Sequence, residues 1–96
     1  MDDIDLAYIA GFFEGEGNAG IYKNGGNSVV LTVEICQNDP KPLHYVKEIF
    51  GYGSLCLTRK RKCNRWRVTG KPAKDFLRRI YPYCKYRQEL VQSLMI

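Results

Sequence analysis

The clearest pattern in the chain is a regular alternation of side chains over residues 28–37. Its odd-numbered positions up to residue 35 are all aliphatic: Val29, Leu31, Val33 and Ile35. Its even-numbered positions are mostly polar: Ser28, Val30, Thr32 and Glu34. Because successive side chains of a strand point to opposite faces, we expect one face of this strand to pack on a core. The other face is expected to meet water or a ligand.

Three further segments have the composition of strands, at 18–23, 54–60 and 65–69. The NGGN sequence after the first of them predicts a tight turn, so the first segment and the 28–37 strand should form a hairpin. In the other two segments, the side chains predicted to face the core are Leu55, Leu57, Trp66 and Val68.

Helices are predicted at 4–13, 43–50 and 72–80, with a last helix from about residue 86 to the end. Asp3 or Asp5 is available near the start of the first helix as a cap or a first-turn acid, and Tyr81-Pro82 favours an extra helical turn before the last helix. The element order is therefore αββαββα. It predicts a single α+β domain over 1–96: a four-stranded antiparallel sheet with helices on one face and an open saddle on the other.

The composition is that of a small globular domain with a polyanionic partner. The chain has 96 residues, of which 45% are hydrophobic and 26% charged, with a net charge of +5 and a pI near 9.1. No apolar run approaches the ~20 residues of a membrane span, and no signal peptide opens the sequence. We therefore expect no membrane partner and an intracellular location.

The cysteines do not have the spacing of a metal site. The four cysteines are Cys36, Cys56, Cys63 and Cys84, and no two of them form a C-x-x-C pair. The single histidine, His44, does not have the spacing of a metal ligand relative to them. Reduced thiols in an intracellular protein are the favoured interpretation over zinc or disulfides.

Basic residues gather around the predicted turn of the second hairpin: Arg59, Lys60, Arg61, Lys62, Arg65 and Arg67. A charged hairpin tip is often only solvated. Here, however, Arg65 and Arg67 alternate with Trp66 and so fall on the open face of the sheet. Cys56, Thr58 and Lys60 fall on that face of the neighbouring strand.

A two-stranded ribbon of this kind fits the major groove of DNA, where arginine can bond guanine and other cations can hold phosphates. The polar face continues through the first hairpin, at Asn18, Tyr22, Asn24, Ser28, Thr32 and Glu34. These residues predict a surface that reads nucleic acid. An unrelated RNA-binding sandwich is the competing interpretation, and Tyr22 is the main aromatic candidate for it.

The segment YIAGFFEGEG, residues 8–17, is an apolar helix that finishes in two carboxylates, Glu14 and Glu16. Acids at a helix C-terminus oppose the helix dipole at a cost of about 0.3–1 kcal/mol each, so a positive group must compensate them. Ala7, Gly11 and Gly15 recur every fourth residue and form a smooth ridge that another backbone could approach closely.

Residues 9–17, IAGFFEGEG, resemble the signature of the LAGLIDADG homing endonucleases, with glutamate in place of aspartate at both acidic positions. The resemblance extends to the αββαββα order, the FGYG turn at 50–53, and YCKYRQ at 83–88. It also includes Gln37 at the end of the second strand. It therefore covers nearly the whole chain.

The resemblance implies a site-specific, metal-dependent DNA endonuclease. Glu16 and the backbone carbonyl of Gly15 are expected to hold Mg²⁺ or another divalent cation, which would also offset the adverse dipole and the repulsion between the two acids. Glu14 is expected to be structural. Gln37 would order water in the active site, and Arg87, with Lys85 as the competitor, would stabilise charge at the phosphate. Lys41 is a loose match to a second basic position.

One signature per chain implies a homodimer on a palindromic or nearly palindromic site, as in single-motif members of the family. Its expected interface is the ridge of Ala7, Gly11 and Gly15. The alternative is a non-catalytic protein on the same fold, such as an intron maturase or a repressor.

Overall fold

A computed structural model describes residues 2–23, 25–57 and 63–95. Along the chain its helices and strands are α1 (Asp3–Glu16), β1 (Gly17–Lys23), β2 (Val29–Gln37), α2 (Lys41–Phe50), β3 (Ser54–Cys56), β4 (Asn64–Thr69), α3 (Lys71–Ile80), the 3₁₀ turn η1 (Tyr81–Tyr83) and α4 (Gln88–Leu94). The predicted αββαββα order and the α+β class are confirmed.

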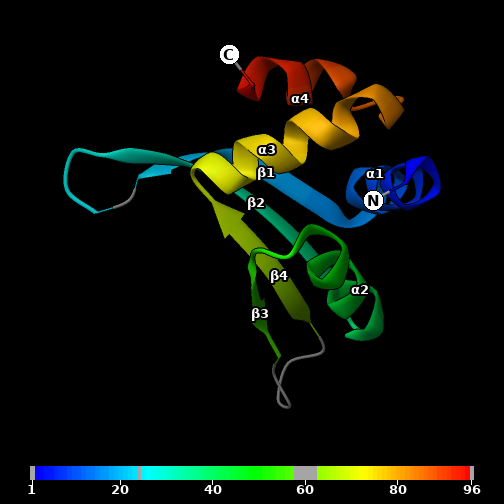
Figure 1. Cartoon of the computed structure of the whole chain (residues 1–96). Helices are drawn as coiled ribbons and strands as arrows, with labels where there is room; N and C mark the ends of the chain where they lie inside the picture. The colour runs from blue at the N-terminus through cyan, green and yellow to red at the C-terminus, as the bar shows by residue number, and fades with distance from the viewer. Residues whose placement is uncertain (1, 24, 58–62, 96) are drawn as a thin grey trace.

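The four strands form one antiparallel sheet in the order β1-β2-β4-β3. The helices lie to one side of this sheet, and the β1–β2 hairpin reaches out past them (Figure 1). This reach explains why Val29, predicted to face the core, is 64% exposed. The strand pairing itself follows the predicted alternation, since Val33, Ile35, Trp66 and Val68 are all buried.

The core lies between the sheet and the helices and is built largely from aromatic rings. Phe76 of α3 contacts the rings of Phe13, Phe50 and Trp66, with centroids 4.8–5.9 Å apart. Such tilted and edge-on pairs add about 0.5–1.5 kcal/mol each beyond the area they bury. The indole nitrogen of Trp66 donates to the carbonyl of Tyr52 at 3.1 Å, so its only polar atom is satisfied. This packing fixes the sheet under α1 and α3.

Several element boundaries differ from those predicted. Asp2 caps α1, because its carboxylate accepts from the backbone N–H of Asp5 at 2.9 Å, and Asp3 and Asp5 are acids of the first turn. Leu57 lies beyond the last paired residue of β3 and is 49% exposed, so it does not face the core.

The last helix starts two residues later than predicted, at Gln88, because the preceding backbone is held by α1 in the contacts described below. The extra turn predicted near Tyr81-Pro82 is present as η1. In the part of the chain that the structure describes, no helix has both the length and the apolar character needed to cross a membrane.

Candidate active site and nucleic-acid interface

Glu14 is buried and fully occupied by hydrogen bonds from the far end of the chain. Its carboxylate accepts from the backbone N–H groups of Lys85, Tyr86 and Arg87 at 2.8–2.9 Å. Burial raises the pKa of this carboxyl, but the three N–H donors and the positive charge of Arg87 outweigh it, so the pKa lies below its usual value. The side chain therefore ties α1 to the segment before α4.

These contacts change the expectation that metal ions would compensate both acids of the signature. The charge of Glu14 is balanced by protein donors, and its oxygens are turned into the interior, where only 5% of the residue is exposed. The hydroxyl of Tyr86 also donates to the Glu14 carbonyl. The sequence gives no signal for this three-point contact, since its partners lie 71 to 73 residues away.

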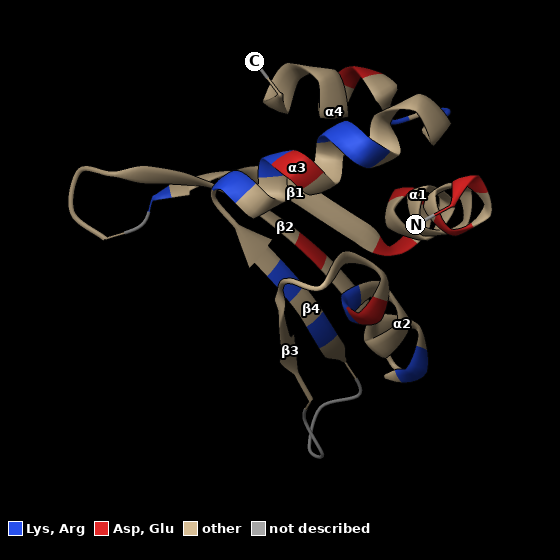
Figure 2. Ribbon diagram, in the orientation of Figure 1, with Lys and Arg blue, Asp and Glu red and all other residues tan. Residues whose placement is uncertain are grey.

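Glu16 has the opposite surroundings. It is the last residue of α1 and is exposed, and α1 runs directly into β1 at this point (Figure 2). The neighbouring Gly15 is also exposed. Among residues 2–23, 25–57 and 63–95, no group of three or more histidines, cysteines or acids could hold a metal by itself. One chain thus offers one free carboxylate at the helix end. This suits Mg²⁺, which commonly takes one or two carboxylates and completes its shell with water and phosphate oxygens.

Arg87 brings a positive charge to the same end of α1. Its guanidinium donates to the carbonyl of Gly17 at 2.5 Å, and its central carbon lies 5.8 Å from the ring centroid of Phe13. Lys85, the predicted competitor, is exposed, and its contact with this helix is made through its backbone N–H. The geometry therefore favours Arg87 as the cation near Glu16.

Gln37 ends β2, as predicted. Its side-chain oxygen accepts from the backbone N–H of Asn38 at 2.8 Å, which fixes the orientation of the amide. Asn64, opposite Gln37 on β4, donates to the carbonyl of Asn38 at 2.8 Å and holds the same turn. The turn that leads from β2 into α2 is thus anchored on both strands.

The two arginines of β4 lie on the open face, but their surroundings differ. Arg67 is exposed, whereas Arg65 forms an ion pair with Glu34 of β2 at 3.2 Å. The charge of Glu34 is the main reason why the pKa of Arg65 is raised. In Figure 2 the basic positions of β4 lie beside the acidic position of β2. The alternation in the sequence predicts the same role for both arginines, whereas the structure shows that only Arg65 is paired with an acid of the neighbouring strand.

The other predicted contacts with nucleic acid have mixed exposure. Asn18, Tyr22 and Ser28 are exposed. Thr32 is only 2% exposed, so its hydroxyl would need its neighbours to move before it could contact a ligand. Four predicted residues lie outside the described part of the chain: Asn24, Thr58, Lys60 and Arg61.

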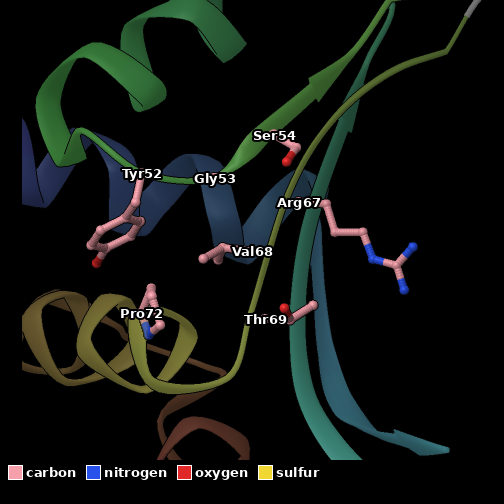
Figure 3. Close-up of a pocket in the computed structure, with 7 residues that line it drawn as sticks. All are labelled: Tyr52, Gly53, Ser54, Arg67, Val68, Thr69 and Pro72. Carbon is pink, nitrogen blue, oxygen red and sulfur yellow. The ribbon is translucent and has the colours of Figure 1, made fainter. Parts of the chain in front are cut away.

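A hollow with a volume of about 540 Å³, for which the sequence gives no signal, lies at the edge of the sheet. It is lined by Tyr52, Gly53, Ser54, Arg67, Val68, Thr69 and Pro72. Figure 3 shows Val68 directed toward the helix side of β4 and Arg67 directed away from the hollow. The hollow therefore does not enclose the Arg67 guanidinium, which is presented on the open face.

A family model described as LAGLIDADG endonuclease matches residues 9–88. The chain belongs to this family. The matched range includes both acids of the signature, the glutamine that ends β2 and the arginine beside Gly17, and it extends to the first residue of α4.

The fold is also that of solved homing endonucleases. The chain matches I-CvuI, in complex with the I-CreI target, with a TM-score of 0.79 and 20% identity, over 96% of this chain and 64% of that one. It matches the group I intron-encoded I-CeuI, complexed with DNA, with a TM-score of 0.66 and 16% identity, over 98% and 55% of the two chains.

A third structure is the LAGLIDADG meganuclease I-AabMI bound to uncleaved DNA, with a TM-score of 0.68 and 20% identity over 94% of this chain and 35% of that one. At these identities the likeness shows the fold. The chain spans 64% of I-CvuI and smaller shares of the other two, and it matches no curated protein sequence.

Proposed function

We propose that this LAGLIDADG chain is a site-specific, metal-dependent endonuclease that cuts both strands of DNA as a homodimer, on a palindromic or nearly palindromic site. The observation that carries the proposal is the division between the two signature acids. The carboxylate of Glu14 is buried and accepts hydrogen bonds from backbone N–H groups, whereas Glu16 is exposed at the helix end. Arg87 donates to the carbonyl of Gly17, the residue after Glu16. A purely structural motif would give no reason to leave the second acid exposed against the helix dipole.

The residues around Glu16 fit phosphodiester hydrolysis. The Glu16 carboxylate and the Gly15 carbonyl would hold Mg²⁺ or another divalent cation, which supplies an activated water and charge stabilisation at the leaving oxygen when bound. Arg87 contributes a fixed positive charge beside the phosphate. Gln37, whose amide is oriented by Asn38, would position a water. Lys85 stays a weaker candidate for the role of Arg87.

The homodimer is supported by the outward face of α1. Ile4 and Tyr8 are 80% and 53% exposed on this helix, although both are largely apolar. Ala7, Gly11 and Gly15 are exposed as well, and a Cβ atom built on either glycine would meet no other atom within 4 Å. A helix that is apolar on its core side and on its solvent side is typical of one covered by a partner. A second copy of the chain would also bring a second Glu16 to the site.

Double-stranded DNA is the proposed partner because the open face carries Arg67, Asn18 and Tyr22 exposed beside the Arg65–Glu34 pair. The solved relatives I-CvuI, I-CeuI and I-AabMI are themselves described in complexes with DNA. Basic and polar side chains on one sheet face are the usual means by which a protein holds phosphates and reads base edges.

The proposal is tested by Glu16→Gln on a duplex site selected from a randomised library. The change removes the anionic metal ligand and keeps the size of the side chain. We expect cleavage in Mg²⁺ to be lost while binding stays within a few-fold of wild type. Glu48→Gln, at an exposed acid of α2, is the matched control and should cut normally.

Cleavage by Glu16→Gln at the wild-type rate would remove Glu16 from the mechanism. Specific binding by the wild type with no metal-dependent cleavage would favour the maturase or repressor alternative.

A further inference from the structure

Three residues of β1 alternate onto the open face of the sheet: Asn18, Gly20 and Tyr22. The side-chain nitrogen of Asn18 donates to the hydroxyl of Tyr22 at 3.4 Å, although the two residues are four positions apart. The tyrosine ring must therefore fold back along the strand toward Asn18. It remains 47% exposed in this position, so it is available to a ligand.

Gly20 provides the space in which this ring lies. A Cβ atom at Gly20 would lie 3.0 Å from the Tyr22 hydroxyl oxygen, 3.1 Å from Cζ and 3.2 Å from Cε2. The backbone of Gly20 has no positive φ, so a left-handed conformation is not the reason for glycine here. Because the nearest atoms belong to the end of a side chain, alanine would move the ring and leave the strand in place.

The hydrogen bonds around Asn18 fix which atoms face outward. The backbone N–H of Ala19 donates to the side-chain oxygen of Asn18 at 3.0 Å, so the amide has its nitrogen toward Tyr22. The Tyr22 oxygen then acts as an acceptor, which leaves its own proton to donate elsewhere. The second N–H of the Asn18 amide is also a donor. The pair is thus rich in donors.

The neighbouring acid, Glu34, does not use the free donors of Asn18 and Tyr22. Glu34 lies directly opposite Asn18 across the β1–β2 ladder and would be the natural acceptor for its amide. The Oε2 atom of its carboxylate is instead paired with the Arg65 guanidinium at 3.2 Å. The donors of Asn18 and Tyr22 are therefore left for a ligand that approaches the open face.

We propose that Asn18 and Tyr22, with the ring positioned by Gly20, form one specificity unit that selects guanine at one base pair of each half-site. This inference rests on the proposed DNA function and deepens it. Guanine is the base that presents two acceptors, N7 and O6, in the major groove. Adenine places a donor beside its acceptor, thymine has a single acceptor, and cytosine has a donor. A pair of donors therefore matches guanine best.

The test measures metal-free binding to the selected site and to all single-base-pair substitutions of it. The wild type should prefer guanine at one position in each half-site. Tyr22→Phe keeps the ring and removes the donor, so the guanine preference should fall about tenfold at that position and stay unchanged elsewhere. Gly20→Ala should give a similar loss at the same position.

A double-mutant comparison isolates the role of Gly20. In a Tyr22→Ala background there is no ring to displace, so Gly20→Ala should have no further effect on base preference. An additional loss in that background would overturn the positioning role of Gly20.

Two outcomes overturn the specificity unit itself: an unchanged guanine preference in Tyr22→Phe, or an equal loss of affinity for every duplex. In both cases a wild type that still binds its site specifically leaves the proposed function intact. A wild type that binds all duplexes alike would overturn the specificity unit and the proposed function together.

Discussion

The two glutamates of the signature, only two positions apart in the sequence, have different chemistry because their surroundings differ. Glu14 accepts three backbone N–H groups in the interior, and Glu16 faces solvent at the end of α1. A carboxylate satisfied by protein donors stabilises the fold, whereas an exposed one keeps its lone pairs for a cation. Stability and catalysis should therefore separate when the two are changed one at a time.

Glu14→Gln should reduce the free energy of unfolding near pH 7 by about 1.5–3 kcal/mol, the usual contribution of hydrogen bonds to a charged group. The folded-state pKa of Glu14 lies below the usual 4.5, so its stabilisation is fully present above that value. It is lost as the pH falls through the folded-state pKa. The difference between wild type and variant should therefore shrink in acid.

Urea unfolding of both proteins from pH 7 down to pH 3 measures this difference. Glu89→Gln, at an exposed acid of α4, is the control and should change stability little. A gap between wild type and Glu14→Gln that is the same at every pH would contradict the role assigned to the ionised carboxylate.

The two arginines of β4 give a second comparison at the residue scale. Arg67→Ala should cost about 1–3 kcal/mol of binding on the preferred site and relax the preference at particular base pairs. Arg65 is already paired with Glu34, so Arg65→Ala should instead leave that acid facing DNA and weaken binding to all duplexes about equally. Affinities on matched and mismatched sites at several salt concentrations separate the two. The same loss of base preference in both variants would show that the ion pair with Glu34 does not keep Arg65 from contacting bases.

At the scale of elements, α1 has two roles on opposite faces. Its inner face packs Ile9, Ala10 and Phe13 into the core, where all three are fully buried. Its outer face is apolar and exposed, with the two glycines open around their Cα atoms. Those glycines cost helix stability, about 1 kcal/mol each against alanine, and the close approach of a second helix would offset that cost.

Gly11→Leu should therefore prevent dimerisation while leaving the monomer folded, since a leucine side chain fills the space that a partner backbone would occupy. Sedimentation at micromolar concentration would report the change, with far-UV circular dichroism to confirm the fold. Lys74→Leu, at an exposed position of α3, is the control for an added leucine and should stay dimeric. A dimer unchanged in Gly11→Leu would place the interface elsewhere.

The sequence predicted the elements well because their patterns are local. The alternation in β2 and in β4 shows directly in the burial of Val33, Ile35, Trp66 and Val68. What it missed depends on partners distant in sequence. The start of α4 is set by Glu14 of α1, and the state of Arg65 is set by Glu34 across the sheet. Neither contact leaves a periodic signal in the chain.

The candidate site likewise has features that the sequence predicted and features that only the structure shows. The signature pointed to Glu16, and the structure adds that Arg87 donates to the carbonyl of the next residue, Gly17. The signature could not reveal that Tyr86 also bonds the α1 backbone, or that Thr32 is buried. These facts follow from how the helix end and the sheet pack together.

At the scale of the whole molecule, the helix layer serves stability and the open face is proposed to contact DNA. The helices and the core cover one side of the sheet, and the open face carries polar side chains together with Arg65 and Arg67 of β4. The charge is +5 per chain, so two copies joined through α1 would present +10 to a polyanion. Such a surface should bind duplex DNA with a steep dependence on salt, because each phosphate contact releases a counterion. The specificity must then come from the few side chains that reach base edges.

The most direct test of the proposed function is selection of cleaved molecules from a randomised duplex library, incubated with the protein and Mg²⁺. We expect a palindromic or nearly palindromic site cut on both strands, with no cutting when the metal is chelated. The proposed function would be contradicted if the protein bound a defined duplex yet left both strands intact at every Mg²⁺ concentration, or if it cut without a metal.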